Sequence, residues 1–522
     1  MQQFYRLLLS TLLLTSVLAC EQHVKVGKPL IEYNFNNTLK NTGMAKAAIF
    51  GPQAVAYAFD KKDTCLDLSI NASLRQALSV KLKDDFSFND YKGFTVSCRV
   101  KKDPLDPEAY TILSHNHVDS MGWHGWKINA QANGAWEWQL SDGERTWNYK
   151  PTVKQAINDG NWHQICFSYN AQLEEAKLFF DGNNVAIISL FNNQLQLSNT
   201  PVIIGNDTPV KRSKDLFNGV IDDFTIWSRA LSDAEVKSIH NQKSKICSQP
   251  YEIDEQLKVM TWNIWDGGTH DGRYIGIQKI TQLIQQENPD VVFLQESNNT
   301  GIAIADALNY IIYQRSPEIS VLSRFPLIRS HNIFQTESFG CIELAVTNDE
   351  SVIACPIQLS AAPDLSTYLR SPEAKVDSIL KWENQNRGKQ ARFILSELTH
   401  LIINSDEKPI IIGGDFNSGS HRDWSDKNAV RNNNLSVKYP ASTRFEHKGF
   451  TDSYRQLHPD ETKHFGYTLS PRFDSIMHNR TSFIHYKGKK LYPAECYVVN
   501  EHQNGFPSDH AAVVTVFNWK GN

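Results

Sequence analysis

The stretch that decides the fold is PIIIGGDFNSGSHRDW, residues 409–424. Three isoleucines indicate a buried strand, and Gly413-Gly414 then lead to Asp415 and, two residues on, Asn417. A plain strand-to-loop turn accounts for this composition, because glycine, aspartate and asparagine are common in turns. The alternative is a strand that delivers a carboxylate and an amide to a functional site. In that case the glycines are expected to let the backbone bend sharply, so that both side chains point at one ligand.

Length and composition indicate a globular protein of two or three domains. The chain has 522 residues, which is more than one typical domain. Its content of 41% hydrophobic and 21% charged residues is ordinary for a globular protein. The net charge of -4 gives no overall positive field of the kind that attracts nucleic acid.

The first 20 residues have the features of a targeting signal. Arg6 precedes an apolar run at residues 7–14, which is too short to span a bilayer as a helix. The following VLAC, residues 17–20, resembles the bacterial lipobox, in which the cysteine is lipidated and becomes the mature N-terminus. A secretory signal that happens to contain a cysteine is the alternative. We expect a lipoprotein signal peptide over residues 1–20 and an extracytoplasmic protein, periplasmic or on the cell surface, anchored to a membrane through lipidated Cys20.

The chain has eight cysteines, and seven remain if Cys20 carries lipid. Seven is an odd number, so at least one thiol is expected to stay free. No CxxC pair is present, so a structural zinc site is not expected. Disulfides are permitted outside the cytoplasm, but the sequence does not give their pairing.

Residues 25–245 show the pattern of an all-β domain. Short runs of alternating apolar residues recur, for example QICFSY at 164–169, and this spacing predicts an antiparallel sandwich or jelly roll. Asp181-Gly182 is expected to close a hairpin. The first convincing helix is expected at Asp233, with Ser232 as its N-cap. The turn signals between the runs are Asn133-Gly134, Asp142-Gly143, Asp159-Gly160 and Asp181-Gly182.

Three motifs in this half resemble the laminin-G-like, concanavalin-A-like jelly roll. They are DGNWHQICFSYN at 159–170, LFFDGNNVA at 178–186 and FNGVIDDFTIWSRALSDAEV at 217–236. The resemblance implies that this domain binds carbohydrate or another extracellular ligand, so a glycan or glycolipid is an expected partner. Some members of the family bind calcium, but Asp222-Asp223 is more typical of a structural turn pair than of a ligand cluster.

The pattern changes after residues 246–256, which are polar and are expected to form a linker. Apolar runs of strand length now alternate with segments that repeat apolar residues at helical spacing. Asn288-Pro289 is expected to end the first helix. The alternation predicts an α/β domain over residues 257–520, with a sheet core covered by helices. The expected strands are 257–264 and 290–295, and the expected helices are 274–287 and 391–402.

Polar side chains lie at the ends of several strands, or within strand-like segments, of this second half. Each alone carries little weight, because polar residues end strands in every protein. Five such positions, all of metal-ligand or acid-base type, favour a common pocket, since open sheets gather ligands at strand ends. They are Asn263, Glu296, Asp415 with Asn417, Asp474, and Asp509 with His510.

The order of these motifs resembles that of the endonuclease/exonuclease/phosphatase superfamily, the deoxyribonuclease-I-like fold. The resemblance covers about residues 255–520 and implies a four-layered α/β sandwich with two central mixed sheets. The expected fold is therefore multi-domain, with a jelly-roll sandwich followed by this α/β sandwich. The motifs are Trp262-Asn263, Gln295-Glu296, Ser323-Arg324-Phe325-Pro326, Gly414-Asp415-Phe416-Asn417, Arg472-Phe473-Asp474 and Ser508-Asp509-His510.

The resemblance implies a divalent-metal site built from oxygen ligands. Glu296 is the main expected ligand, with Asn263 and Asp509 completing the site directly or through water. Hard oxygen donors suit Mg²⁺ or Mn²⁺ rather than zinc.

The resemblance also implies the groups that face the phosphate. Asp415 is expected to activate or position the nucleophile, and the Asn417 amide to donate to a phosphoryl oxygen. His510 is expected to contact the phosphate or to take the proton of the attacking water. Asp474 is expected to hold the His510 ring in place, as carboxylates commonly do for a working histidine. Arg324 is a further expected substrate-binding residue.

One position departs from the family pattern. The family usually has histidine in the strand before the Asp-Asn loop, whereas the matching stretch here, VIACPIQLSAAP at 352–363, carries Gln358. Glutamine can donate a hydrogen bond to a phosphate, and Gln358 is expected to do so, but it cannot supply a proton near neutral pH. A metal-bound water and His421 are the alternative sources of that proton. Loss of a general acid typically costs about 10²–10⁴-fold in rate.

Two functions follow for the whole chain. The first is a metal-dependent phosphoesterase that cleaves a phosphodiester or phosphomonoester. The alternative is a surface-binding lipoprotein whose phosphoesterase domain is catalytically degenerate, which the glutamine in place of histidine favours. No basic run with interleaved aromatic residues is present, so a dedicated nucleic-acid surface is not expected. The sequence does not give the substrate class.

Overall fold

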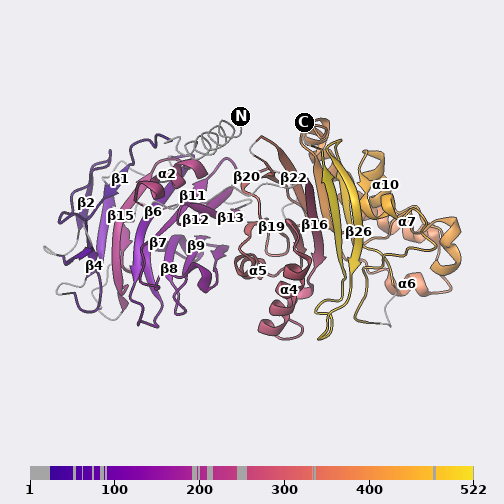
Figure 1. Cartoon of the computed structure of the whole chain (residues 1–522), viewed down its shortest axis with the longest axis horizontal. Coiled ribbons are helices and arrows are strands. Elements are labelled where there is room, and N and C mark those ends of the chain that lie inside the picture. Colours follow the sequence, from indigo (N-terminus) through magenta and orange to yellow (C-terminus); the bar gives the residue numbers. More distant parts are fainter. Residues whose placement is uncertain are drawn as a thin grey trace, which may run out of the picture.

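The computed structural model shows an all-β domain and an α/β domain side by side (Figure 1). Both fold classes agree with the sequence-based prediction. The predicted signal peptide with Cys20 and most of the predicted linker lie outside the described residues. The structure describes residues 24–520 except 51–54, 61–62, 73–75, 83–87, 89–90, 191–194, 196, 198–199, 208–214, 244–254, 332, 334–336, 348 and 474–477.

The N-terminal domain is a sandwich of two antiparallel sheets. Strands distant in sequence pair within each sheet, as in a jelly roll. In the described part of the chain, the first sheet has the order β10 (Thr146–Tyr149), β9 (Trp136–Asp142), β8 (Trp123–Ala130), β7 (Tyr110–Val118), β14 (Val202–Ile204), β5 (Leu78–Leu82) and β2 (Ala47–Phe50). The second has the order β13 (Asn183–Ser189), β12 (Glu175–Phe180), β11 (His163–Asn170), β6 (Gly93–Lys102), β15 (Gly219–Trp227), β4 (Asp63–Asp67) and β3 (Tyr57–Asp60), and β1 (Ile31–Tyr33) also pairs with β15.

The core of the sandwich is aromatic. Trp126 and Trp138 of the first sheet contact Phe167 of the second, with ring centroids 5.2 and 5.8 Å apart, and all three are fully buried. The predicted hairpin at Asp181-Gly182 is confirmed. These two residues have φ of 49° and 75°, the left-handed values that a tight turn between β12 and β13 requires.

The Asp222-Asp223 pair lies at an irregularity of β15. The register with β6 shifts between Asp222 and Thr225, and Asp223 has a φ of 46°. The Asp223 carboxylate lies 3.6 Å from the Arg99 guanidinium. This is the geometry of a β-bulge, which agrees with the structural interpretation of the pair.

The C-terminal domain has two mixed sheets that face each other. The first continues the large sheet in the order β26 (Leu491–Val499), β27 (Ala512–Trp519), β16 (Gln256–Asn263), β17 (Val291–Gln295), β19 (Ser320–Ser323) and β18 (Ile311–Gln314). The second, in the described residues, has the order β20 (Leu327–Ser330), β21 (Ile342–Ala345), β22 (Ser351–Gln358), β23 (Ile410–Asp415), β25 (Ser482–Lys487) and β24 (Thr451–Asp452).

Helices cover both outer faces, which gives four layers (Figure 1). Alternate residues of β17 explain this layering: Phe293 packs between the sheets, while Val292 packs toward α4. Strands buried on both faces are continuous apolar runs for this reason. One side carries α3 (Trp265–Gly268), α4 (Arg273–Glu287) and α5 (Gly301–Leu308). The other carries α6 (Ser366–Arg370), α7 (Val376–Gln385), α8 (Arg387–Glu397), α9 (Thr399–Ile403), α10 (Pro440–His447) and α11 (Ser453–Leu457).

The predicted elements agree with these bounds, with one difference. Asn288 ends α4 in the left-handed conformation, as Asn-Pro predicts. The helix α2 (Asp233–Lys243) begins where predicted, and Ser232 Oγ accepts a hydrogen bond from Glu235 N at 3.3 Å. The helix expected over 391–402 begins earlier and divides at Leu398 into α8 and α9.

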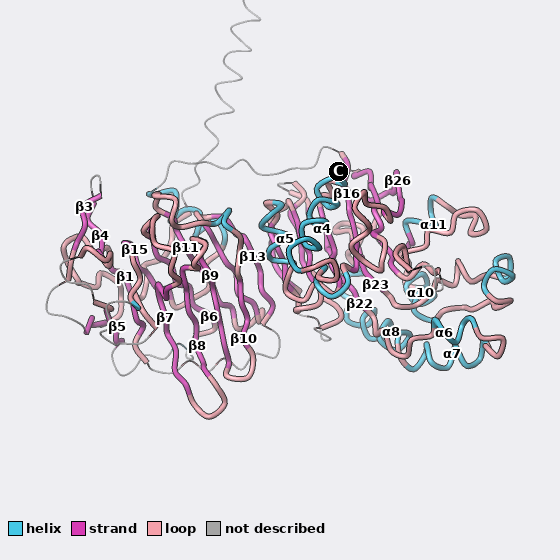
Figure 2. The backbone as a smooth tube through the Cα atoms, turned by 90° about the horizontal axis from the view of Figure 1, so that it is seen from below, coloured by secondary structure: helices cyan, strands magenta, loops and turns pink. Residues whose placement is uncertain are grey.

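The two domains share one sheet. Strands β13 and β18 pair in parallel, with Ile187 opposite Tyr313, so the large sheet runs through both domains. Figure 2 shows β13 at the side of its domain that faces α5. A second contact is made by Asp306 of α5, whose carboxylate accepts hydrogen bonds from Thr152 N and Gln155 Nε2, both at 2.7 Å. Asp306 is only 7% exposed, so this contact is part of the buried interior.

The cysteines of the described residues form one disulfide. Cys341 and Cys355 are joined across β21 and β22, and both are fully buried. The described cysteines outside this disulfide are all buried, and they are Cys65, Cys98, Cys166 and Cys496. Within the same residues, no helix combines the length and the hydropathy that a membrane span needs.

Candidate active site

Several of the predicted site residues come together at one edge of the C-terminal domain, where strands of both facing sheets end. Asn263 ends β16 and Glu296 follows β17, and these neighbouring strands are parallel. Gln358 ends β22 and Asp415 ends β23, which are also parallel and place these two residues opposite each other. Since the carboxyl ends of parallel strands meet at one edge, each sheet delivers two polar side chains to the same place.

Asn263 connects the two sheets. Its side-chain Nδ2 donates to Glu296 Oε1 at 2.8 Å and to Asp415 Oδ2 at 3.2 Å. Its Oδ1 accepts from Trp265 N at 3.0 Å, which fixes the amide orientation. Asn263 and Asp415 are both fully buried, so one amide holds two carboxylates in a fixed relation.

His510 and Asp509 enter this cluster from the segment before β27. Trp262 Nε1 donates to the His510 carbonyl at 2.8 Å, and Ser508 Oγ donates to the Asn263 carbonyl at 2.8 Å, which fasten the segment to β16. His510 Nε2 then lies 3.8 Å from Asp415 Oδ2.

Three acidic groups crowd the site. Burial raises the pKa of Asp509, His510 opposes this, and the carboxylates of Glu296 and Asp415 raise the pKa of Asp509 further, so that it lies above its usual range. The Asp509 Oδ1 atom is buried and has no hydrogen-bond partner among the described residues. Such a group is expected to meet a cation, because a buried carboxylate oxygen without a partner is costly.

The two glycines before Asp415 act differently from the prediction. Both lie in extended strand β23, and the chain turns only at Asn417, which has a φ of 48°. A Cβ at Gly413 would lie 2.3 Å from the Phe293 ring, and one at Gly414 would lie 1.8 Å from the Ile357 carbonyl. The glycines therefore let β23 pack closely against β17 and β22, and the expectation that they bend the backbone was wrong.

Gln358 lies in the cluster, where the aligned stretch predicts it. Its Nε2 is 3.4 Å from Glu296 Oε1, and its backbone is directly opposite Asp415 in the ladder. The side chain is half-buried, so its amide can reach a ligand at this edge. Whether it contacts the substrate stays a prediction.

Arg324 and His421 lie away from the cluster. Ser323 pairs with Val291 at the start of β17, so Arg324 is at the opposite end of that strand from Glu296, 3.5 Å from the Asp290 carboxylate. The predicted substrate-binding role of Arg324 is corrected on this ground. His421 binds Ser442 and Glu446 through its two ring nitrogens, so it does not replace the missing acid. Asp474 lies outside the described residues.

Sequence reasoning missed two acidic neighbours of Glu296. Asp266 N donates to Glu296 Oε2 at 3.4 Å, from the turn that follows β16. Burial raises the pKa of Glu318, and the carboxylates of Glu296 and Asp266 raise it further. Asp266 could have been found from the sequence, because it lies only three residues after Asn263. Glu318 lies in an irregular loop with no motif around it.

A cavity of about 330 Å³ lies beside His510 and Asn417. Its walls come from α6, α7, α8 and the loop after β23, and they combine apolar side chains such as Leu365 with polar ones such as Asn479. The Asn417 Nδ2 donates to the Leu359 carbonyl at 2.9 Å, which leaves its second N–H for a ligand. The cavity therefore opens beside two of the predicted site residues.

The donor set at this edge fits a hard divalent cation. Glu296 and Asp509 are carboxylates, Asp509 has a buried oxygen without a partner among the described residues, and the other residues of the cluster are amides, the Asp415 carboxylate and the His510 imidazole. Oxygen-only ligand sets suit Mg²⁺ or Mn²⁺. The Asn263 oxygen is bound to Trp265 N, so it is better placed to orient Glu296 than to ligate directly.

Comparison with known proteins agrees with this architecture. Residues 260–510 match the Endonuclease/Exonuclease/phosphatase family, and residues 76–237 match the Concanavalin A-like lectin/glucanases superfamily. An uncharacterized protein of Caenorhabditis elegans is 27% identical over 299 residues, which are 51% of this chain and 92% of that protein. Among solved structures, TDP2 from C. elegans (19% identity, TM-score 0.37) covers 50% of this chain and 74% of its own. The human Nocturnin catalytic domain (17% identity, TM-score 0.37) covers 51% and 94%.

The C-terminal domain therefore belongs to the endonuclease/exonuclease/phosphatase family of phosphoesterases. The N-terminal domain belongs to the concanavalin A-like lectin and laminin G group. Members of the phosphoesterase family typically use Mg²⁺.

Proposed function

We propose that the C-terminal domain hydrolyses a phosphodiester or phosphomonoester with the help of Mg²⁺ or Mn²⁺. The observation that carries this proposal is the convergence of Asn263, Glu296, Gln358, Asp415 and His510 from separate segments onto one edge. A structural role for one of these residues is easy to accept. A joint structural role is harder to accept, because three crowded carboxylates, of which Asp415 is fully buried, cost free energy beside a buried imidazole unless a cation or ligand interacts with them.

Each residue has a role that its contacts support. Glu296 and Asp509 would hold the cation, which supplies positive charge to the phosphoryl oxygens as negative charge develops on them. His510 takes the proton of the attacking water, and Asp415, 3.8 Å away, stabilises the imidazolium that results. The second N–H of Asn417 and the amide of Gln358 donate to phosphoryl oxygens. The oxygen of water bonds to phosphorus as the ester P–O bond breaks.

The departing oxygen presents a difficulty. Gln358 cannot give it a proton, and His421 is bound elsewhere. The leaving group must then depart as an anion or take a proton from solvent. We therefore propose that good substrates have acidic leaving groups, such as another phosphate or a phenol.

Turnover of generic phosphoesters tests this proposal. The protein without residues 1–20 is incubated with bis-p-nitrophenyl phosphate, p-nitrophenyl phosphate, a phospholipid and single-stranded DNA, each with Mg²⁺, Mn²⁺ or chelator. We expect cation-dependent hydrolysis of the nitrophenyl esters ahead of esters with alkyl leaving groups. Absence of turnover on every substrate, from a folded protein, would favour the alternative of a binding protein with a degenerate phosphoesterase domain.

For the N-terminal domain we propose the binding of a glycan or glycolipid. The support is a cavity of about 1080 Å³ on the outer face of the second sheet, next to α2. Trp162 in its wall lies beneath the Arg99 guanidinium, 5.0 Å from it, and aromatic faces of this kind pack against sugar rings. Binding to immobilised glycans, lost in Trp162→Ala and kept in the exposed Leu105→Ala, is the expected result.

We also propose that the protein is a membrane-anchored lipoprotein outside the cytoplasm, tethered through Cys20. The support is the lipobox-like sequence alone. Incorporation of labelled palmitate by the wild-type chain and not by Cys20→Ser is the expected result, and equal labelling would contradict the tether.

A further inference from the structure

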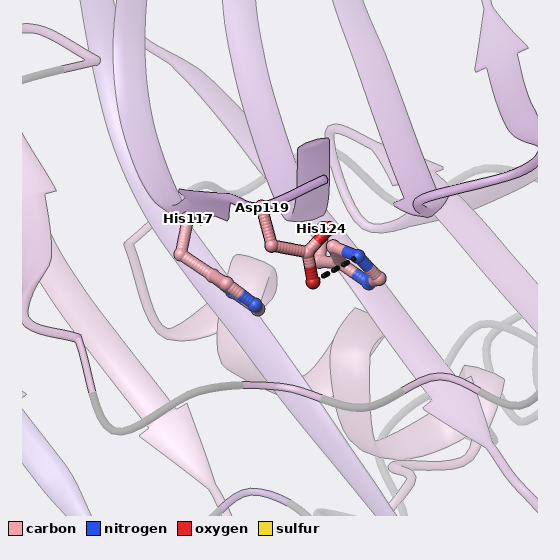
Figure 3. A group of neighbouring side chains, drawn as sticks. All are labelled: His117, Asp119 and His124. Atoms are coloured by element: carbon pink, nitrogen blue, oxygen red, sulfur yellow. Dashed lines mark ion pairs between the residues drawn. The ribbon is translucent and has the colours of Figure 1, made fainter. Parts of the chain in front are cut away.

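A second group of candidate metal ligands lies in the N-terminal domain, on the β7–β8 hairpin (Figure 3). The sequence HVDSMGWH, residues 117–124, contains all three members: His117, Asp119 and His124. His117 and His124 are directly opposite each other in the ladder between β7 and β8. Directly opposite residues direct their side chains to the same face of a sheet, so the two imidazoles are neighbours.

The three side chains converge closely. One candidate ligand atom from each residue lies within 4.8 Å of the other two, and the imidazole centroids are 4.8 Å apart. Asp119 Oδ2 is 3.1 Å from His124 Nε2. Figure 3 shows the carboxylate directed at His124, with the His117 ring on its other side. Zinc bonds of about 2.0–2.2 Å place neighbouring ligands roughly 3.3 Å apart, so small side-chain rotations complete the geometry.

The histidine nitrogens lack other partners. Nδ1 of His124 makes no hydrogen bond within the described residues, although His124 is only 7% exposed, and the one polar contact of its Nε2 there is with the Asp119 carboxylate. Nδ1 of His117 is likewise buried and without a hydrogen bond to any described residue. A neutral imidazole has one donor and one acceptor nitrogen, and a buried ring nitrogen without a partner is unfavourable. A cation that accepts the ring lone pairs removes this difficulty.

Among the described residues, the candidate protein ligands number three. Asp142 is opposite His124 on β9, but its carboxylate accepts from Arg145 N at 2.7 Å and from Glu144 N at 3.2 Å, so it serves the turn. Gly143 closes the other side, because a Cβ there would lie 2.5 Å from the His124 ring. Three protein ligands leave a coordination position for water or for an oxygen of a bound ligand.

We propose that His117, Asp119 and His124 bind a divalent transition-metal ion, with Zn²⁺ as the best fit. Two imidazole nitrogens and one carboxylate oxygen are ligands that zinc prefers. Calcium and magnesium need more oxygen atoms than this hairpin offers. The ion joins two strands and their turn, and it is chemically distinct from the oxygen-ligand site of the C-terminal domain. The expectation of no structural zinc site considered only cysteine motifs.

Zinc binding to the purified protein tests the proposal, with excess Mg²⁺ present to occupy the oxygen-ligand site. The number and affinity of bound Zn²⁺ ions are measured by competition with a chromophoric chelator. We expect His117→Gln and Asp119→Asn each to bind one Zn²⁺ ion fewer at high affinity. The affinity of this site should fall by at least about 10–100-fold, the cost known for disturbing metal-site residues. His447→Gln, on an exposed histidine of α10, should match the wild type.

Thermal melting gives an independent readout. Zn²⁺ should raise the melting temperature of the wild type and of His447→Gln, and should leave that of His117→Gln unchanged. Circular dichroism establishes that each variant is folded. If a histidine variant does not fold, Asp119→Asn gives the test instead, because Asp119 is exposed. Equal zinc stoichiometry and affinity in the wild type and in a folded His117 or Asp119 variant would overturn the proposal.

Discussion

Replacing Asp423 by alanine should strongly destabilise the protein. Asp423 lies in the segment that continues from Asp415 and Asn417, and its carboxylate accepts from Arg455 Nε at 2.5 Å and from Arg480 Nε at 2.9 Å. Both guanidinium groups have only 2% of their side-chain surface exposed. The carboxylate therefore holds the loop of the candidate site against two buried cations.

The size of this destabilisation follows from the partners that Arg455 and Arg480 keep in the variant. Arg480 keeps Asp452, at 2.6 Å, as a counter-charge. Within the described residues Arg455 keeps hydrogen bonds to backbone carbonyls, of which those of His458 and His464 are at 2.8 and 2.7 Å. One buried positive charge thus loses its anion, and breaking a buried pair in this way typically costs about 3–5 kcal/mol of the free energy of unfolding.

Urea unfolding followed by tryptophan fluorescence measures this cost. The matched control is Asp406→Ala, which removes the same charge from an exposed pair with Lys489, where screening by water leaves little to lose. We expect a large fall in the unfolding midpoint for Asp423→Ala and almost none for Asp406→Ala. Equal midpoints for the two variants would show that the buried network does not anchor the loop.

Three further predictions concern pH, the domain contact and the altered catalytic position. Burial raises the pKa of Asp452, but Arg480, His485 and the Arg455 N–H together lower it to about 2 from 3.8, so its stabilising contribution of about 2 kcal/mol is present above about pH 4 and is lost toward pH 2. Urea unfolding between these pH values should show this loss, with a shallower slope for Asp452→Asn; equal slopes would contradict it. Asp306→Ala should lower stability by about 1–3 kcal/mol, because it leaves the half-buried Thr152 N–H and a buried Gln155 donor unmet, and an unchanged melting temperature would refute this. Gln358→His should speed hydrolysis most for esters with poor leaving groups, while Gln358→Ala slows all substrates a few-fold, about the value of one neutral hydrogen bond. Rates equal to wild type for both variants would remove Gln358 from the mechanism.

The sequence predicted most of the fold because its signals are local. The alternation of QICFSY and the Asp-Gly turns identify an all-β domain, and the helical spacing of Ile277, Ile280 and Ile284 identifies α4. The shared sheet between β13 and β18 has no local signal. Edge strands carry the same side-chain pattern whether they pair with another domain or face water, so pairing across domains is decided by the tertiary fold.

Reasoning from strand ends located Asn263, Glu296 and Asp415 in the candidate site, and the family resemblance located Gln358. The resemblance misplaced Arg324, because a motif gives the residue and not the end of the strand at which it lies. The glycines before Asp415 were misinterpreted for a related reason. A glycine in the sequence shows only that a side chain is absent. The structure shows whether its absence allows a turn or a close packing contact.

The dependence of hydrolysis on Mg²⁺ in Glu296→Gln tests the central claim most directly. Rates on bis-p-nitrophenyl phosphate are measured over a Mg²⁺ titration for the wild type, for Glu296→Gln and for Glu397→Gln, which makes the same change on the exposed face of α8. A metal contributes several kcal/mol to the transition state, so loss of its main ligand should lower the rate at least about 100-fold, with melting unchanged. Glu397→Gln should match the wild type. A Glu296→Gln variant with the wild-type rate and Mg²⁺ dependence would contradict the assignment of this edge as a metal-dependent phosphoesterase site.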